Sequence, residues 1–89
     1  MTQAVFIADD FGHSPTANAA ILRCHTGGAL TGAGLMPGAP AAVHAAALAR
    51  AHPTLALGWH LHLCDARPLT RERWPWPDSP WRAGLALGL

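Results

Sequence analysis

Three short apolar segments begin near residues 4, 30 and 55 of this 89-residue chain, so that successive starts are 26 and 25 residues apart. The stretches between them carry residues that begin, fill and end helices. Strands that alternate with helices in this way predict a parallel sheet, since parallel neighbours need a long crossover connection. An eight-stranded barrel of about 250 residues allots about 31 residues to each strand and helix. We therefore expect an α/β fold, the N-terminal βαβαβ part of a TIM-like (β/α) barrel with parallel strands.

The first apolar segment, residues 4–8 (AVFIA), predicts a strand that is buried on both faces and ends at Asp9 and Asp10. Ser14 and Pro15 then predict a helix start. A serine side chain caps free backbone N–H groups, and a proline in the first helical position gives up no hydrogen bond.

Glycines mark the end of this helix and the character of the next strand. The helix should run to about residue 25 and stop at Gly27 and Gly28, because a left-handed helix terminus favours glycine. The weaker second strand, residues 30–36 (LTGAGLM), has Gly32 and Gly34 on one face. A neighbouring group can approach closely there.

The third strand has two different faces. It follows an alanine-rich helix expected over residues 41–51, which Pro40 opens and Pro53 ends. Residues 55–63 (LALGWHLHL) alternate strictly, so side chains of one kind share one face. The bulky apolar face has Leu55, Leu57, Trp59, Leu61 and Leu63, and the other has Ala56, Gly58, His60 and His62.

Composition bounds what the chain can be. Hydrophobic residues make up 51% and charged residues 12%, which excludes a disordered tail. Alanine supplies 19 positions, against 18 for Leu, Ile, Val and Phe together, and this is a thin core for a small domain. We expect a fragment that is buried against something else.

Charge and segment length exclude other classes. A net charge of +1 is too small for the basic surface of a nucleic-acid binder. No segment is long enough for a membrane span or a signal segment, and two cysteines far apart in sequence favour a reducing compartment. The expected location is the cytoplasm.

The end of the chain differs from the rest. Residues 70–89 are rich in Pro, Trp and Arg, and predict a long loop or truncated tail after a first unit at 1–69. The final AGLALGL can also begin another element. Trp74, Trp76 and Trp81 suggest stacking on a sugar ring or a nucleic-acid base, or plain packing against the rest of a barrel.

Candidate chemical groups come from two strand ends. Asp9 and Asp10 follow the first strand, and His60 and His62 lie near the end of the third. Working groups of a (β/α) barrel lie at the carboxyl ends of its strands. Carboxylate and imidazole together suit a cation such as Zn²⁺, and a second carboxylate can take a proton from water. The alternative interpretation is that the aspartates are capping groups and the histidines are core residues bonded to backbone.

The other four histidines show no ligand spacing. Surface or helix-end positions account for them, and two of the four are placed to favour helix C-termini. These residues are His13, His25, His44 and His52, of which His25 and His52 are the helix-end pair.

Three segments together resemble the N-terminal part of the YdjC-like carbohydrate deacetylases, some of which are associated with hopanoid biosynthesis. They are IADDFGHSPTANAAI, LTGAGLMPGAP and LGWHLHLCDARPL, in this order, and the resemblance runs from about Val5 to Leu69. It implies a barrel-like fold and metal-dependent removal of an acetyl group from an N-acetylated sugar.

The resemblance also implies roles for single residues. Asp10 and His60 correspond to ligands of a divalent metal ion, either Zn²⁺ or Mg²⁺, and Asp9 to the general base that activates water. Asn18 stands where the family tends to have asparagine, although an exposed helix residue is the simpler interpretation.

The chain also departs from the family pattern. The family's third ligand is a histidine further downstream, whereas no histidine follows His62 here. His62 is expected to line the substrate pocket rather than replace that ligand. We therefore expect an inactive fragment whose open sheet edge favours self-association. The alternative is a non-enzymatic metal-binding or interaction module that a partner chain completes.

Overall fold

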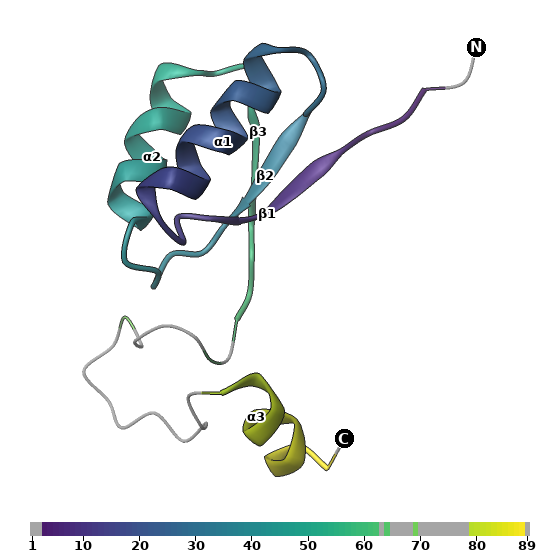
Figure 1. Ribbon diagram of the computed structural model, residues 1–89, viewed down its shortest axis with the longest axis vertical. Coiled ribbons are helices and arrows are strands. Elements are labelled where there is room, and N and C mark those ends of the chain that lie inside the picture. Colours follow the sequence, from purple (N-terminus) through teal and green to yellow (C-terminus); the bar gives the residue numbers. More distant parts are fainter. Residues whose placement is uncertain (1–2, 63, 65–68, 70–78, 89) are drawn as a thin grey trace.

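A computed structural model describes residues 3–62, 64, 69 and 79–88 (Figure 1). Its three strands are β1 (Ile7–Phe11), β2 (Gly32–Leu35) and β3 (Ala56–Trp59), and they form one parallel sheet in the order β1-β2-β3. The helices are α1 (Pro15–Thr26), α2 (Ala42–Ala51) and α3 (Pro80–Ala86). The expected α/β order of three parallel strands alternating with helices is confirmed.

Both crossover helices, α1 and α2, lie on the same face of the sheet (Figure 1). Parallel crossovers share one hand, so strands that are added in sequence order place every helix on the same side. This is the arrangement from which a (β/α) barrel is built. No described helix is long and apolar enough to cross a membrane.

Helix α1 begins and ends where the sequence predicts. The Ser14 side chain accepts a hydrogen bond from the Ala17 backbone N–H at 3.0 Å, and Pro15 is the first helical residue. At the other end, Gly28 has a φ of +86°, the left-handed conformation that favours glycine.

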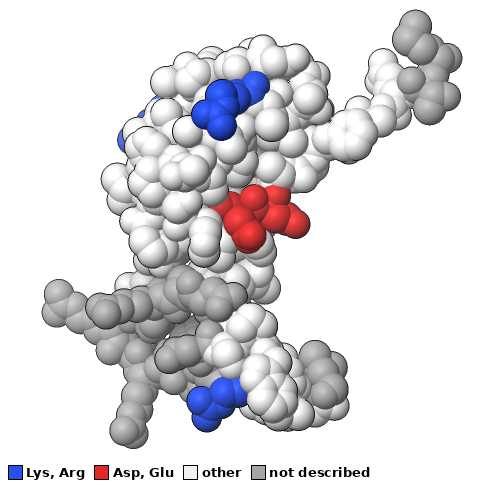
Figure 2. Space-filling view, viewed as in Figure 1, with Lys and Arg blue, Asp and Glu red and all other residues white. Residues whose placement is uncertain are grey.

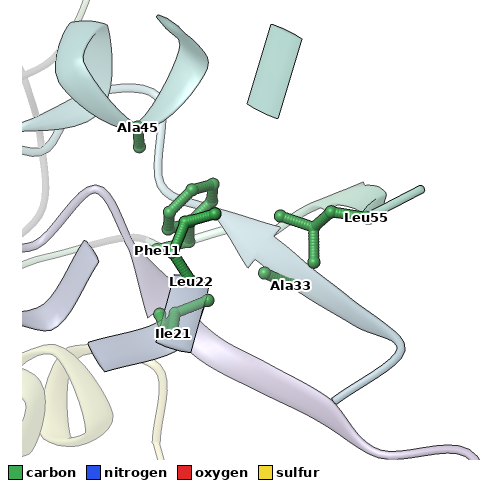
Figure 3. Packing of buried hydrophobic residues seen from close by; sticks show 6 residues of the cluster. All are labelled: Phe11, Ile21, Leu22, Ala33, Ala45 and Leu55. Carbon is green, nitrogen blue, oxygen red and sulfur yellow. The ribbon is translucent and has the colours of Figure 1, made fainter. Parts of the chain in front are cut away.

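The core lies between the sheet and these two helices (Figure 3). Phe11, at the end of β1, is fully buried and is one of the two largest fully buried side chains in the described residues. Its contacts fix the strand end that carries the aspartates. The buried cluster comprises Phe11, Ile21, Leu22, Ala33, Ala45 and Leu55.

The prediction that the first strand is buried on both faces is wrong. The strand begins later than expected, and Val5, Phe6 and Ile7 are exposed, Ile7 by 56%. Two causes combine, since β1 is an outer strand and Ile7 pairs with Gly32, on the face that α1 and α2 leave open. Within the described residues nothing covers that face at Ile7.

The third strand is also shorter than predicted. Pairing in β3 ends at Trp59, although the His60 backbone N–H still donates to the Leu35 carbonyl at 2.9 Å. Leu57 and Trp59 pair with Ala33 and Leu35 and so share the helix-covered face, yet both are exposed. The described helices do not extend over this outer strand.

Two histidines stabilise helix ends, as the sequence indicates. The His25 Nδ1–H donates to the Leu30 carbonyl at 2.7 Å, and the same ring's Nε2 lies 2.9 Å from the Thr54 hydroxyl. His52 donates from Nδ1 to the Leu48 carbonyl at 2.8 Å, at the end of α2. The His25 ring thus connects the end of α1 to the segments that precede β2 and β3.

The tail is described only from residue 79 onwards. Helix α3 begins at Pro80 after Ser79, whose hydroxyl accepts from the Arg82 backbone N–H at 3.4 Å. Residues 80–86 of the predicted loop are therefore helical, and the first four residues of AGLALGL belong to this helix. Trp81 is exposed, whereas Trp74 and Trp76 lie outside the described residues.

Gly12 occupies the turn between β1 and α1 under two constraints. Its φ is +103°, and a Cβ atom there would lie 3.2 Å from both the Met36 carbonyl oxygen and the Ala42 Cα. Other residues would suffer backbone strain and a steric clash together.

We expect Gly12→Ala to lower the free energy of unfolding by about 2 to 4 kcal/mol, since left-handed strain and overpacking add. Urea denaturation followed by circular dichroism measures this. Gly28→Ala is the matched control, because its φ is +86° but nothing lies within 4 Å of its Cβ position. An equal loss in both variants would show that packing around Gly12 is unimportant.

Candidate metal centre at the carboxyl end of the sheet

A β-bulge places the two aspartates at the end of β1. Ala8 pairs with Ala33 and Phe11 with Leu35, so β1 advances by three residues over the length in which β2 advances by two. Asp10, in the bulge, has a φ of +63°, which is uncommon for a residue other than glycine but is tolerated by aspartate. Bulges of this kind redirect a side chain at the rim of a sheet. The bulge is the local reason that Asp10 faces β3.

Asp10 lies close to His60, although the two residues belong to opposite edges of the sheet. The Asp10 Oδ1 and His60 Nδ1 atoms are 3.4 Å apart, although the residues are 50 positions apart in sequence. The side chains are 60% and 28% exposed, respectively, so the pair is open to solvent. The structure therefore brings together the two residues that the sequence analysis assigned to metal binding. Their role as ligands stays a prediction.

The His60 Nδ1 atom also lies 3.4 Å from the Asp10 backbone nitrogen. A hydrogen bond from that N–H needs a lone pair on Nδ1, whereas a hydrogen bond to the carboxylate needs a proton on it. The two contacts cannot form together. Nδ1 must be unprotonated either to accept from the backbone or to bind a metal ion, and because it has a single lone pair, a metal ion at Nδ1 would replace the backbone hydrogen bond.

Two glycines of β2 leave room for the contact between Asp10 and His60. A Cβ atom on Gly34 would lie 3.3 Å from the His60 Cβ, and one on Gly32 would lie 2.7 Å from the Ala56 carbonyl oxygen. The predicted close approach at these two glycines is confirmed. Gly34 is thus the small residue that lets His60 lie against the sheet.

The donor set and the spacing suit a cation. Two ligands at about 2.1 Å from a tetrahedral Zn²⁺ lie about 3.4 Å apart, and carboxylate oxygen and imidazole nitrogen are both zinc ligands. This is the separation between the Asp10 and His60 atoms. Over residues 3–62, 64, 69 and 79–88, no group of three His, Cys, Asp or Glu side chains is placed to hold a metal ion.

Asp9 and His62 lie beside this pair. Asp9 is exposed, and together with Asp10 it forms one acidic patch, separate from the arginine side chains (Figure 2). The His62 ring centroid is 6.2 Å from that of His60, and its Nδ1–H donates to the Cys64 carbonyl at 3.1 Å. His62 is therefore oriented by the backbone next to the pair, while its role in substrate binding stays untested.

Asn18 is a residue whose environment the sequence analysis predicted wrongly. Its side chain is 0% exposed and not on the surface of α1. Its amide contacts the Gly12 backbone, the Ala41 carbonyl and the His44 ring. The signal was available, because Ile21 and Leu22 lie three and four residues further on and share its buried helix face.

The family is decided by sequence comparison. A sequence model of the family described as YdjC-like protein matches residues 3–85, nearly the whole chain. The chain belongs to the YdjC-like family. The match includes both strand ends of the candidate site and extends into α3.

Several curated relatives of this YdjC-like chain have the name carbohydrate deacetylase. One from Vibrio cholerae serotype O1 is 42% identical over 71 residues, which are 80% of this chain and 28% of the relative. Another, from Geobacillus stearothermophilus, is 50% identical over 62 residues, or 70% of this chain and 25% of the relative. The chain thus spans about a quarter of the length of the curated relatives it matches.

A solved structure gives the same picture. The crystal structure of a candidate cellobiose-phosphate cleavage protein from Enterococcus faecalis V583 superposes with a TM-score of 0.68 at 36% sequence identity. The superposition covers 74% of the YdjC-like chain and 26% of the other protein. The βαβαβ unit is therefore similar to one part of a larger fold.

We expect Gly34→Val to separate His60 from Asp10, because even a Cβ atom there is already tight against the His60 Cβ. The measurement is the nuclear Overhauser effect between the Asp10 amide proton and the His60 ring protons, which should disappear. Gly58→Val is the control, since its Cβ position meets nothing closer than 4.0 Å. A persistent effect in Gly34→Val would show that the glycine is not needed for the approach.

Proposed function

We propose that this chain forms the N-terminal, cation-holding part of a metal-dependent carbohydrate deacetylase, which removes the acetyl group from an N-acetylated sugar. The observation that carries the proposal is the 3.4 Å separation of the Asp10 carboxylate and the His60 ring, at the carboxyl ends of the two outer strands β1 and β3. The names of the curated relatives support the reaction class. Among the described residues, no third His, Cys, Asp or Glu side chain joins this pair to complete a ligand set.

Asp10 and His60 would hold the cation in this proposal. One carboxylate and one imidazole favour Zn²⁺ over Mg²⁺, which prefers oxygen ligands. A bound divalent cation polarises an amide carbonyl and lowers the pKa of bound water toward about 7. Amide hydrolysis requires both effects.

Asp9 would take the proton from the attacking water. It is exposed at the same bulge as Asp10, so solvent reaches it while its neighbour holds the cation. His62 would contact the sugar from the end of β3, where its ring lies edge-on to His60 at an interplanar angle of 72°. In this division of roles, residues 1–69 supply the first part of the barrel, and residues 70–89 follow it.

A second candidate, an interaction module that a partner chain completes, is favoured by the exposed apolar side chains. Val5, Phe6 and Ile7 are exposed next to one outer strand, and Leu57 and Trp59 on the other. In the part of the chain that the structure describes, no further strand pairs with the outer edges of β1 and β3, and exposed apolar side chains at such edges favour association, including self-association. A measurement of activity distinguishes the two candidates. If this chain is only an interaction module, a barrel that is completed with it has no hydrolytic activity.

We expect Zn²⁺ to shift the His60 ring ¹⁵N resonances of the 89-residue chain, and Asp10→Asn and His60→Ala to remove this site. The reason is that a cation held by two ligands is bound weakly, and a cation held by one ligand is bound more weakly still. Zinc titration followed by nuclear magnetic resonance distinguishes this site from the other five histidines. His13→Ala is the control and should leave the His60 response of the chain unchanged. An unaltered His60 response in Asp10→Asn would remove the assignment.

Activity is testable in a chimera, in which residues 3–62 replace the matching segment of the Geobacillus stearothermophilus relative. We expect this chimera to release acetate from N-acetylglucosamine oligomers. Asp9→Asn should lower kcat by about 100-fold or more, since general base catalysis contributes about 10²- to 10⁴-fold, while zinc content stays unchanged. An inactive but folded, zinc-loaded chimera would favour the interaction module.

A further inference from the structure

Asn18 is the fully buried amide at the centre of the turn that follows β1. Its Oδ1 accepts a hydrogen bond from the Gly12 backbone N–H at 2.7 Å. Its Nδ2 donates to the Ala41 carbonyl at 3.2 Å and to the His44 Nδ1 at 3.0 Å. Because both Nδ2 protons have acceptors, the amide can face in only one direction, with its oxygen toward Gly12.

We propose that Asn18 is a positioning residue for the cation site. It holds the Gly12 N–H, and thereby the turn in which Asp10 keeps its carboxylate beside the His60 ring. The expected effect of Asn18 on metal binding rests on the proposed function. Its expected effect on the distance between Asp10 and His60 does not.

The backbone of Asp10 needs such support. Its φ of +63° is a sparsely populated conformation, which persists only where the surroundings determine it fully. The carbonyl groups of the turn are held by three backbone hydrogen bonds, and Asn18 provides a side-chain acceptor for an N–H group of the same turn. The three bonds run from His13 N–H to the Asp10 carbonyl (3.0 Å), from Met36 N–H to the Phe11 carbonyl (2.8 Å) and from Ala41 N–H to the Gly12 carbonyl (2.9 Å).

The two ends of the Asn18 amide have different effects in this proposal. Without the Oδ1 acceptor, the Gly12 N–H is left buried and unpaired, which is costly enough to make the turn rearrange. Gly12 offers little resistance, because glycine occupies many backbone conformations, and the change is passed to Asp10 two residues earlier. Without the Nδ2 donor, the Gly12 bond remains.

Three variants of the 89-residue chain separate positioning from stability. Asn18→Ala removes the acceptor and the donor, Asn18→Asp keeps an acceptor for Gly12 but loses the donor, and His44→Ala removes one acceptor of the Asn18 amide. The first measurement needs no metal and is the nuclear Overhauser effect between the Asp10 amide proton and the His60 ring. The second is the Zn²⁺ concentration that half-shifts the His60 ring resonances. Melting temperatures report stability separately.

We expect all three variants to melt at a lower temperature than the parent chain, yet only Asn18→Ala to lose the Overhauser effect. It should also need about 10- to 100-fold more Zn²⁺, the usual loss when support behind a ligand is removed. Asn18→Asp and His44→Ala should keep both signals. If Asn18 affected stability alone, the Overhauser effect and the zinc response would weaken in each variant in proportion to the fall in its melting temperature.

Several outcomes would overturn the positioning role. They are a retained Overhauser effect in Asn18→Ala, its loss in a folded Asn18→Asp, or its absence from the parent chain. If Asn18→Ala does not fold, the result for Asn18→Asp alone decides the question. The proposal is also overturned if neither Asn18 variant folds while His44→Ala does. A parent chain with the Overhauser effect but no His60 response to Zn²⁺ removes the proposed metal function and leaves the positioning role intact.

Discussion

The turn at Phe11 and Gly12 joins the core to the candidate site. Phe11 is fully buried in the cluster between the sheet and the helices, while Asp10, immediately before it, lies in the bulge beside His60. Gly12, immediately after it, is held at both backbone groups, by Asn18 and by Ala41. Three consecutive residues thus connect hydrophobic burial, backbone strain and the acidic patch, so a change in packing at Phe11 reaches the carboxylate through a single peptide bond.

Much of the fold could be predicted because it follows from local patterns. Ser14, Pro15 and the Gly27–Gly28 pair set the limits of α1, and the alternation in residues 55–63 predicted two unlike faces of β3. The burial of β1 could not be predicted in this way. An apolar run shows that side chains are suited to burial, but the exposure of Ile7 depends on which strands and helices lie beside it.

The candidate site was predictable in its residue types but not in its geometry. Asp10 and His60 were placed at strand ends by pattern and by family resemblance. The φ of Asp10 and the two-against-three register arise from pairing between β1 and β2, which no local pattern encodes. Asn18 was misjudged because a polar residue in a helix usually faces water, and only its spacing to Ile21 and Leu22 indicated otherwise.

Strand order has a consequence for how such a chain is made. Because the sheet runs β1-β2-β3, each strand pairs with the one synthesised just before it. Domains begin to fold during synthesis from the N-terminal end, so β2 can dock on β1 as soon as β2 itself has left the ribosome after α1, and β3 can follow. Among the three described strands, none has to wait for a partner distant in the sequence, and the growing sheet offers the newest strand as the template for the next.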